Sequence, residues 1–413
     1  MNLSYRRDEP KKVRFSRRYG LILAFFLISL LFLLFQGGKF AYMVFIIVAI
    51  LCVYIILGRW SGIAKAEGKR GVSGASKEML SAGTSLAITV DVHVPGIWPL
   101  PYVGVRDTLH HLGVGSTTFE TTLIPDWKRN GQVSYRTHPL RRGHYRFERT
   151  ECTTGDVFGV FEHRGRIELP HSFSVLPETI AISEWNGLKQ MMRGVQHHSI
   201  TTRAQRETTQ INGVREYNYG DRLSRIHWNA TARTGTWKSK EFERESELST
   251  LIILDRQSDR YPDKESFELA VSTAASLLEF GQKRRLSVGL LSVGREAALF
   301  EPKSGSLHFK TMMDHLIGVE ADGSYPLARI LEEHGRSLVP GMLAVLVTPE
   351  KNGGAWKAMN WIHHKQLNGC QILAGAEAGL DHQPWVKFMQ ARGFLAYPVA
   401  SLQDLPVQLG GRG

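Results

Sequence analysis

Two apolar runs, separated by a short connector, dominate the hydrophobicity pattern near the N-terminus. Residues 20–35 (GLILAFFLISLLFLLF) are almost wholly apolar, and the apolar pattern resumes from Phe40 to Leu57. A helix needs about 20 apolar residues to cross a bilayer, with a lower limit of about 17. The second run reaches that length, and Tyr19 extends the first towards it. The pattern predicts two antiparallel transmembrane helices within residues 20–58.

Two other interpretations of this region are less favoured. A cleaved signal peptide would require a small-residue cleavage pattern, but the second apolar run follows the first at once. A single long buried helix would be interrupted by Gly37-Gly38. Basic residues flank both ends of the hairpin, whereas the connector holds only Lys39; they are Arg14, Arg17, Arg18, Arg59, Lys65, Lys69 and Arg70. The positive-inside rule therefore predicts a multi-pass protein of the cell membrane, with its N-terminus (1–19) and soluble domains in the cytoplasm.

The pattern changes to that of short strands after a predicted linker at 59–79. Residues 86–94 alternate between apolar and polar, as expected for a strand buried on one face. Similar short segments without helical spacing follow at 102–107, 133–137, 144–148 and 173–177. Strands at this spacing predict a β-sandwich-like domain over residues 80–177.

The last part of the chain alternates between strand and helix patterns. Residues 249–255 form a continuous apolar run that ends in Asp255, which is typical of a buried parallel strand. Further apolar strands are expected near 286–292, 344–348, 370–374 and 394–399, with helical spacing between several of them. Pro398 suits an edge strand. The pattern predicts a doubly wound α/β domain over residues 249–413.

Charge and cysteine content narrow the function classes. The net charge is +12 and the pI is about 9.6, so nucleic-acid binding must be considered. Much of the excess lies in the first 18 residues, directly before an apolar segment, which fits membrane topology better. The three cysteines form no CxxC pair, which argues against a disulfide framework or a zinc site. We therefore expect a membrane partner and no nucleic acid.

Ionic and aromatic residues concentrate in the remaining segment, 178–248, which connects the two domains. Residues 214–233 read VREYNYGDRLSRIHWNATAR. This motif, an Arg-Gly-x-Tyr segment at 142–145 and a Gly-Asp-Val-Phe-Gly-Val-Phe segment at 155–161 resemble the bacterial family called domain of unknown function 58. Val157 stands where that family usually has proline. The two predicted membrane helices also fit the resemblance.

The resemblance implies a membrane-tethered protein with no established reaction. Members are often encoded beside a MoxR-type AAA+ ATPase and a transglutaminase-like membrane protein, which are the protein partners it suggests. It also implies that the C-terminal domain is similar to a von Willebrand factor A domain.

Two interpretations of the motif stay open. Its arginines could pair with Glu216, Asp221 or Glu243 and fix the register of a β extension. Alternatively, they could form a basic recess for an anionic ligand or a partner's carboxylates, with Trp228 and Tyr217 as aromatic walls. The candidate ligand- or partner-binding residues are Arg215, Asp221, Arg225, Trp228, Arg233 and Asp255.

A metal site is the other candidate. In a von Willebrand A domain, Asp-x-Ser-x-Ser follows the first strand and holds Mg²⁺ through oxygen atoms. Here the sequence from Asp255 is DRQSD, so that Gln257 and Asp259 replace the two serines. Asp255, Asp259 and Thr348 could still supply oxygens. We expect no cofactor; the alternative is Mg²⁺ at this degenerate site, whose loops would otherwise only pack or contact protein.

The preferred functional hypothesis is a membrane-anchored cytoplasmic scaffold or adaptor that works with a MoxR-type ATPase in a cell-envelope process. The alternative is a hydrolase that acts on an anionic envelope precursor, with Asp221, His227 and Asp255 in one cleft. No Ser, Cys or carboxylate is placed by sequence to form a triad with His227. The sequence therefore leaves enzymatic activity undecided and favours the adaptor.

Overall fold

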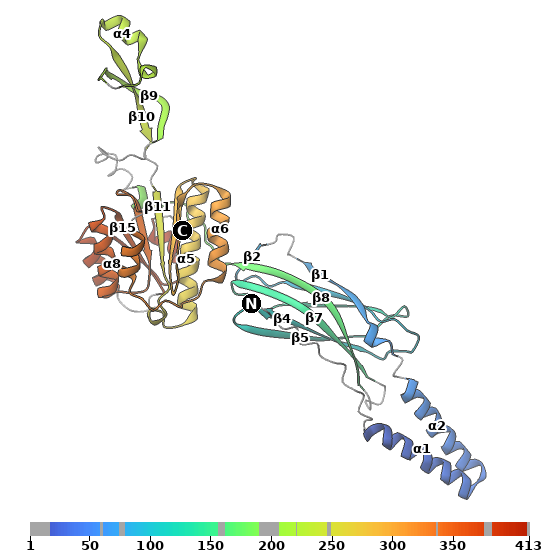
Figure 1. Ribbon diagram of the computed structural model, residues 1–413. Helices are drawn as coiled ribbons and strands as arrows, with labels where there is room; N and C mark the ends of the chain where they lie inside the picture. The colour runs from blue at the N-terminus through green and yellow to red at the C-terminus, as the bar shows by residue number, and fades with distance from the viewer. Residues whose placement is uncertain are drawn as a thin grey trace. The chain divides into compact units, whose positions relative to one another are not determined.

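The computed structural model consists of two compact units, Met1–Val175 and Leu176–Gly413 (Figure 1). It describes residues 17–57, 61–73, 79–155, 162–189, 206–219, 221–245, 249–335, 338–375 and 382–410. The basic residues before Arg17, together with Arg59 and the motif segment 156–161, lie outside these ranges, as do the side chains of Arg17, Arg18 and Glu243.

The first unit begins with two apolar helices that lie side by side. They are α1 (Arg17–Gln36) and α2 (Gly38–Leu57), joined at Gly37. The Cys52 sulfur lies 4.0 Å from the Ile22 carbonyl oxygen, and the Phe26 and Phe45 rings are 5.6 Å apart, so the helices run antiparallel. Among the described helices, α2 alone is long and apolar enough to cross a membrane, whereas the apolar part of α1, Gly20–Gln36, is shorter.

Eight strands in two sheets follow in the described part of this unit. The three-stranded sheet has the order β1 (Glu67–Ser73), β3 (Ala87–His93), β6 (Asn130–Arg136). The five-stranded sheet has the order β2 (Met79–Ser81), β8 (Glu162–Leu176), β7 (Gly143–Gly155), β4 (Val103–His111), β5 (Gly115–Leu123). Alternate residues of β3 (Ile88, Val90, Val92) join one apolar core with Val105 and Phe147 of the other sheet. The sheets therefore share a core, as in a sandwich.

The strand predictions located β3, β4, β6, β7 and β8 but missed others. β1 lies inside the segment 59–79 that was predicted to be a linker, and it pairs antiparallel with β3. Arg70 on β1 was interpreted as a charge flanking the membrane, which is wrong because its side chain is buried in the sandwich. β5 reads GSTTFETTL and is largely exposed, so its pattern carries little apolar signal.

The second unit contains a six-stranded sheet with the order β13, β12, β11, β14, β15, β16. The strands are β11 (Ser249–Asp255), β12 (Ser287–Val293), β13 (Ala297–Lys303), β14 (Leu343–Val347), β15 (Asn368–Ala374) and β16 (Leu395–Val399). All neighbours pair in parallel except β13, which runs antiparallel to β12. β16 is an edge strand, as Pro398 predicts.

Helices cover both faces of this sheet (Figure 1). Ile252 and Leu254 pack in one cluster with α5 (Lys264–Lys283), α6 (Ser306–Gly318) and α10 (Asp404–Gln408). Leu251 and Ile253 pack in the opposite cluster with α7 (Leu327–His334), α8 (Gly353–His364) and α9 (Gln383–Gln390). Burial on both sides explains why the β11 sequence is continuously apolar.

The segment predicted to connect the domains divides into two parts. Ile182, Trp185 and Leu188 are buried in the core of the α/β domain, so this domain includes residues before the predicted boundary at 249. The motif itself forms a separate antiparallel pair, β9 (Arg206–Glu216) and β10 (Lys238–Glu245), with the short helix α4 (Trp228–Thr234) between the strands. We call residues 206–245 the β9–β10 module.

Candidate functional site

Asp255 ends β11 at the carboxyl edge of the sheet, where ligands of open α/β sheets usually bind. Its side chain is completely buried. One carboxyl oxygen accepts a hydrogen bond from the Gln257 amide (3.0 Å), and the other accepts one from the Thr348 hydroxyl (2.8 Å). Burial raises the pKa of Asp255 to about 6. Asp255 therefore organises the loop that follows β11 and presents no oxygen to solvent.

The three candidate metal ligands do not converge. Asp255 and Thr348 are brought together, as the ends of neighbouring strands, but they bond each other directly. The Asp259 side chain is exposed and lies 3.5 Å from Arg260. Mg²⁺ demands near-ideal octahedral coordination by oxygen atoms. In the part of the chain that the structure describes, no group of three or more His, Cys, Asp or Glu side chains could hold a metal. The residues present do not fit Mg²⁺.

Two arginines close this edge of the sheet. Arg256 donates to the Glu320 carbonyl (2.9 Å) and to the Asp322 carboxylate (2.6 Å). A side chain at Gly294 would overlap the ends of the Arg256 and Asp322 side chains and displace this ion pair. Arg260 forms an ion pair with the buried Glu350. Burial raises the pKa of Glu350, and the positive charge of Arg260 makes this rise smaller. These contacts fix the loops around Asp255.

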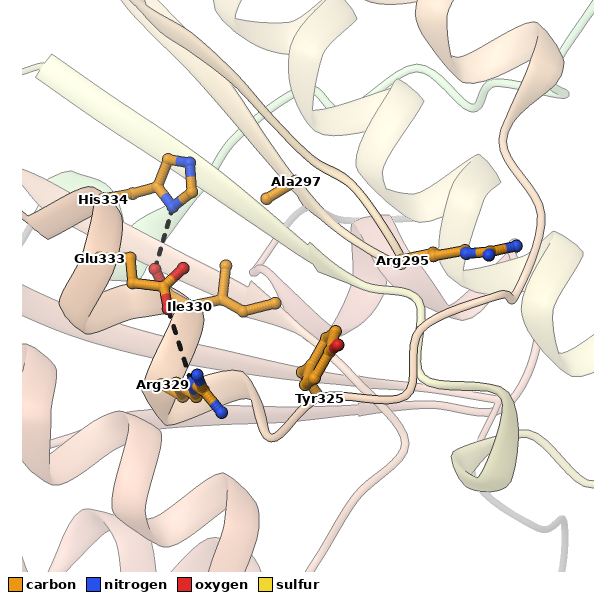
Figure 2. Close-up of a pocket in the computed structure, with 7 residues that line it drawn as sticks. All are labelled: Arg295, Ala297, Tyr325, Arg329, Ile330, Glu333 and His334. Atoms are coloured by element: carbon orange, nitrogen blue, oxygen red, sulfur yellow. Dashed lines mark hydrogen bonds and ion pairs between the residues drawn. The ribbon is translucent and has the colours of Figure 1, made fainter.

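A small open pocket lies beside this edge (Figure 2). Its volume is about 190 Å³, and its lining comes from the β12–β13 turn and from α7 with the residues before it: Arg295, Ala297, Tyr325, Arg329, Ile330, Glu333 and His334. The Tyr325 carbonyl accepts a hydrogen bond from the Gln257 side chain, which connects the pocket to the Asp255 loop. Arg329 lies over the Tyr325 ring (5.6 Å) and 3.5 Å from Glu333, which offsets its charge.

No sequence pattern points to this pocket. Its residues come from separate segments, and none belongs to a recognisable motif. The exposed Arg295 could contact an anionic group, but nothing in the lining selects a particular ligand.

The turn of the β9–β10 module is held by a paired carboxylate. Arg215 lies 2.8 Å from Asp221, whose other oxygen accepts a hydrogen bond from the Asn218 amide (3.1 Å). Arg215 in particular lowers the pKa of Asp221, and Arg225 adds to the effect. The Tyr217 hydroxyl donates to the Asp221 carbonyl (3.1 Å). Pairing within the motif is therefore confirmed for Arg215 and Asp221.

The other predicted pairs differ in detail. The carboxylate of Glu216 contacts Lys238 (3.1 Å), and Arg215 donates to the Glu216 backbone carbonyl (2.9 Å). Arg233 is exposed in the last turn of α4, and Arg225 is half-buried. The motif thus combines a structural turn with cations that remain near the surface.

His227 is the N-cap of α4. Its Nδ1 atom accepts a hydrogen bond from the Ala230 amide (3.2 Å), which satisfies one of the free amides at the helix start. The three residues proposed for a hydrolase site therefore have other contacts. Asp221 bonds Arg215, His227 bonds the Ala230 amide, and Asp255 is buried.

Two aromatic rings of the module contact a third, that of Trp237. The Trp237 ring lies 6.0 Å from Tyr217 and 6.0 Å from Trp228. Trp228 is nevertheless 63% exposed and Trp237 55% exposed. Tyr219 and Leu223, in the turn of the same module, are also exposed. We call Tyr217, Trp228 and Trp237 the aromatic cluster. Trp228 was predicted from sequence, whereas Trp237 lies just beyond the motif and was missed.

The chain is similar to proteins of unestablished function. Residues 213–349 match the family model described as "Protein of unknown function DUF58", a range that spans the aromatic cluster, Asp255 and Thr348. Over 327 residues the chain is 28% identical to the "Uncharacterized protein YeaD" of Bacillus subtilis (strain 168), covering 76% of this chain and 78% of that protein. Both findings support the resemblance to this family.

Similarities to solved structures are weak. Proximal thread matrix protein 1 from the mussel byssus aligns with a TM-score of 0.27 and 11% identity, over 40% of this chain and 45% of that one. The CARDB domain of a Pyrococcus furiosus protein, solved with di-metal ions, aligns with a TM-score of 0.17 and 18% identity, over 27% of this chain and 85% of that one. Alignments at this level do not bear on the function of this chain.

Proposed function

We propose that the chain is a membrane-anchored adaptor that binds a protein partner through the β9–β10 module. In this proposal α1 and α2 form a transmembrane hairpin, and the β-sandwich and the second unit lie in the cytoplasm. The length and apolar character of α2, and the packing of α1 against it, support the anchor. Large apolar side chains such as Phe25, Phe40 and Ile47 are exposed on the two helices, as expected for lipid-facing surfaces.

The observation that carries the proposal is the exposure of the aromatic cluster. Protein interfaces are enriched in tryptophan, tyrosine and arginine, and a few such residues usually supply most of the binding energy. Trp228 and Trp237 touch each other, yet more than half of each side chain remains exposed. The ion pair of Arg215 with Asp221 and the cap at His227 hold the surrounding backbone in place. The cluster is therefore a preorganised contact surface.

Nearby charge indicates the kind of partner. Arg222 and Arg233 are exposed in the same module, and Arg225 is half-buried. Complementary charge would favour a partner that presents carboxylates. The family resemblance suggests a MoxR-type AAA+ ATPase, with a transglutaminase-like membrane protein as a second candidate, in a cell-envelope process.

The α/β domain would have a supporting role. Its resemblance to a von Willebrand A domain suggests a further contact at the carboxyl edge of the sheet. Because Asp255 is buried and its oxygens are bonded, such a contact would use the loops around Arg295 and Tyr325 and not a bridging metal.

Affinity purification from detergent-solubilised membranes tests the proposal. We would compare wild type with Trp228→Ala and Arg225→Ala, and use Leu307→Ala, an exposed apolar residue of α6, as the matched control. Loss of a central tryptophan should weaken partner recovery about 30-fold, because such residues contribute at least about 2 kcal/mol. The Leu307 variant should retain the partner.

Two results would count against the proposal. Wild type that enriches no specific protein would contradict the adaptor function. Equal recovery by wild type and the folded Trp228 variant would show that the aromatic cluster is not the docking surface.

A further inference from the structure

Two loops of the sandwich carry large apolar side chains that the described structure leaves uncovered. Ile97, in the loop before β4, is 101% exposed relative to a free residue. Ile124 and Trp127, in the loop after β5, are 81% and 103% exposed. We call residues 95–102 and 124–129 the apolar loops. Exposed apolar side chains that gather in one place mark a contact site for a protein or a membrane, so the position of the two loops relative to each other decides what they do.

Both loops are joined to the chain that leaves α2. The Arg129 guanidinium donates to the Trp98 carbonyl (2.7 Å) and to the carbonyl of Ser61. Gly62 has a φ of 77° and lies so close to Pro95 that a side chain there would overlap the Pro95 carbonyl oxygen. One guanidinium thus links the two loops to each other and to the segment that follows the helix.

The helix itself also contacts one loop. The Tyr54 ring, in the last turn of α2, lies 5.4 Å from the Trp98 ring. Ser61 follows the helix end at Leu57 by only four residues, which span at most about 14 Å even when fully extended. If α2 crosses a bilayer, the apolar loops must therefore lie close to the surface from which the chain emerges.

We infer that Ile97, Ile124 and Trp127 insert into the headgroup–acyl boundary of the bilayer that α2 crosses. Tryptophan is enriched at this boundary because it combines an apolar ring with a hydrogen-bond donor. The neighbouring Lys128 is exposed and suits anionic headgroups. Pro95, Pro99 and Pro101 restrict the first loop, so that less conformational entropy is lost on insertion.

A protein partner could also cover an exposed apolar loop. The bilayer is favoured because the contacts of Arg129, Gly62 and Trp98 all place the loops beside the end of the apolar helix. The inference rests on the proposed membrane anchor and adds a second lipid contact, which would fix the orientation of the sandwich relative to the membrane.

Spin-label accessibility in the full chain, reconstituted in nanodiscs of zwitterionic and anionic phospholipids, tests this inference. Labels would be placed by Trp127→Cys in the apolar loop, Ile47→Cys in α2 and Leu112→Cys at the opposite end of β4. Leu112 is also exposed, and the nine residues of β4 separate it from the loop end by about 30 Å. The three native cysteines are buried. Ile124→Cys repeats the loop measurement if the tryptophan variant misfolds.

The collision rates with oxygen, which partitions into lipid, and with a water-soluble nickel chelate give the result. We expect the label to collide more often with oxygen than with the chelate at positions 47 and 127. At position 112 we expect more collisions with the chelate. A chelate-dominated signal at 127, with oxygen still dominating at 47, would overturn the inference and leave the anchor intact. A label at 127 shielded from both reagents would indicate a protein contact and also overturn it. A chelate-dominated signal at 47 would refute the anchor and the inference together.

Discussion

Arg70 on β1 and Asp107 on β4 form a buried ion pair that joins the two sheets of the sandwich. The Arg70 Nη2 atom lies 2.7 and 2.8 Å from the two carboxylate oxygens, and both side chains are almost completely buried. Thr150 and Tyr135 also donate to Asp107 (3.2 and 2.5 Å). The Arg70 guanidinium lies 4.2 Å from the centre of the Phe147 ring. This network satisfies two charges that would otherwise be isolated in the core.

Removal of one partner should destabilise the sandwich strongly. We expect Arg70→Ala to lower its free energy of unfolding by about 3–5 kcal/mol, because Asp107 would remain buried without its counter-charge. Hydrogen exchange of β4 peptides at increasing urea concentration would measure this separately from the α/β domain.

The matched control is Arg106→Ala on β4, next to Asp107 in the sequence. Arg106 pairs with Glu120 at 2.7 Å, but both side chains are more than half exposed. Such a pair contributes about 0–1 kcal/mol. Similar losses for the two variants would contradict the role assigned to the buried pair.

Asp255 should make the stability of the α/β domain depend on pH. Its pKa is raised in the folded state, so this group favours folding most below its ordinary pKa. Its contribution is lost as pH rises from about 4 to about 6, a change on the order of 3 kcal/mol. Asp255→Asn should remove this decline, because the amide is neutral at every pH.

Hydrogen exchange of β11 peptides between pH 4 and 7 would give the difference between wild type and variant. The control is Asp263→Asn: Asp263 caps α5, and its hydrogen bonds from Ser266 lower its pKa. In wild type, Asp263 should add stability as pH rises through its lowered pKa. The Asp263→Asn variant should lack that gain. If the stability of wild type and of the Asp255 variant changed with pH in the same way, the raised pKa of Asp255 would be refuted.

Gly62→Ala should loosen the junction between α2 and the sandwich. The left-handed backbone conformation and the overlap with the Pro95 carbonyl both disfavour a side chain, and strain of this kind costs about 1–3 kcal/mol. Limited proteolysis between α2 and β1 should therefore become faster. Gly71→Ala is the control, since its added carbon would meet only ordinary contacts near Thr89. Equal cleavage rates for the two variants would show that the junction tolerates a side chain.

His227→Ala should fray α4 through loss of its cap. An N-cap contributes about 0.5–2 kcal/mol, and asparagine at this position should preserve the helix. Faster hydrogen exchange at Ala230 in the alanine variant, restored by His227→Asn, would support a structural role. Partner recovery that is lost equally in both variants would point instead to a specific requirement for the imidazole ring.

Local sequence patterns determined the kind and order of many elements. Alternation in residues 86–94 predicted β3 because only one face of that strand is buried. The continuous apolar run at 249–255 predicted β11 because helices cover both faces of its sheet. Of the three residues proposed as metal ligands, Asp255 and Thr348 lie together, since parallel neighbouring strands end at the same edge, but they bond each other. Strand β1 escaped prediction because it is polar and its partner strand β3 comes later in the chain, with Arg70 opposite Val90.

Only the tertiary structure decided which charges are structural. In the sequence, Arg70 looks like one more cation behind a membrane helix, and its partner Asp107 lies 37 residues further along the chain. Arg129 likewise acquires its role by reaching back to Ser61, 68 residues away. Local patterns record whether a side chain is buried, because burial follows the periodicity of its own element. They do not record its partner, because distant segments become neighbours only when the sheets close.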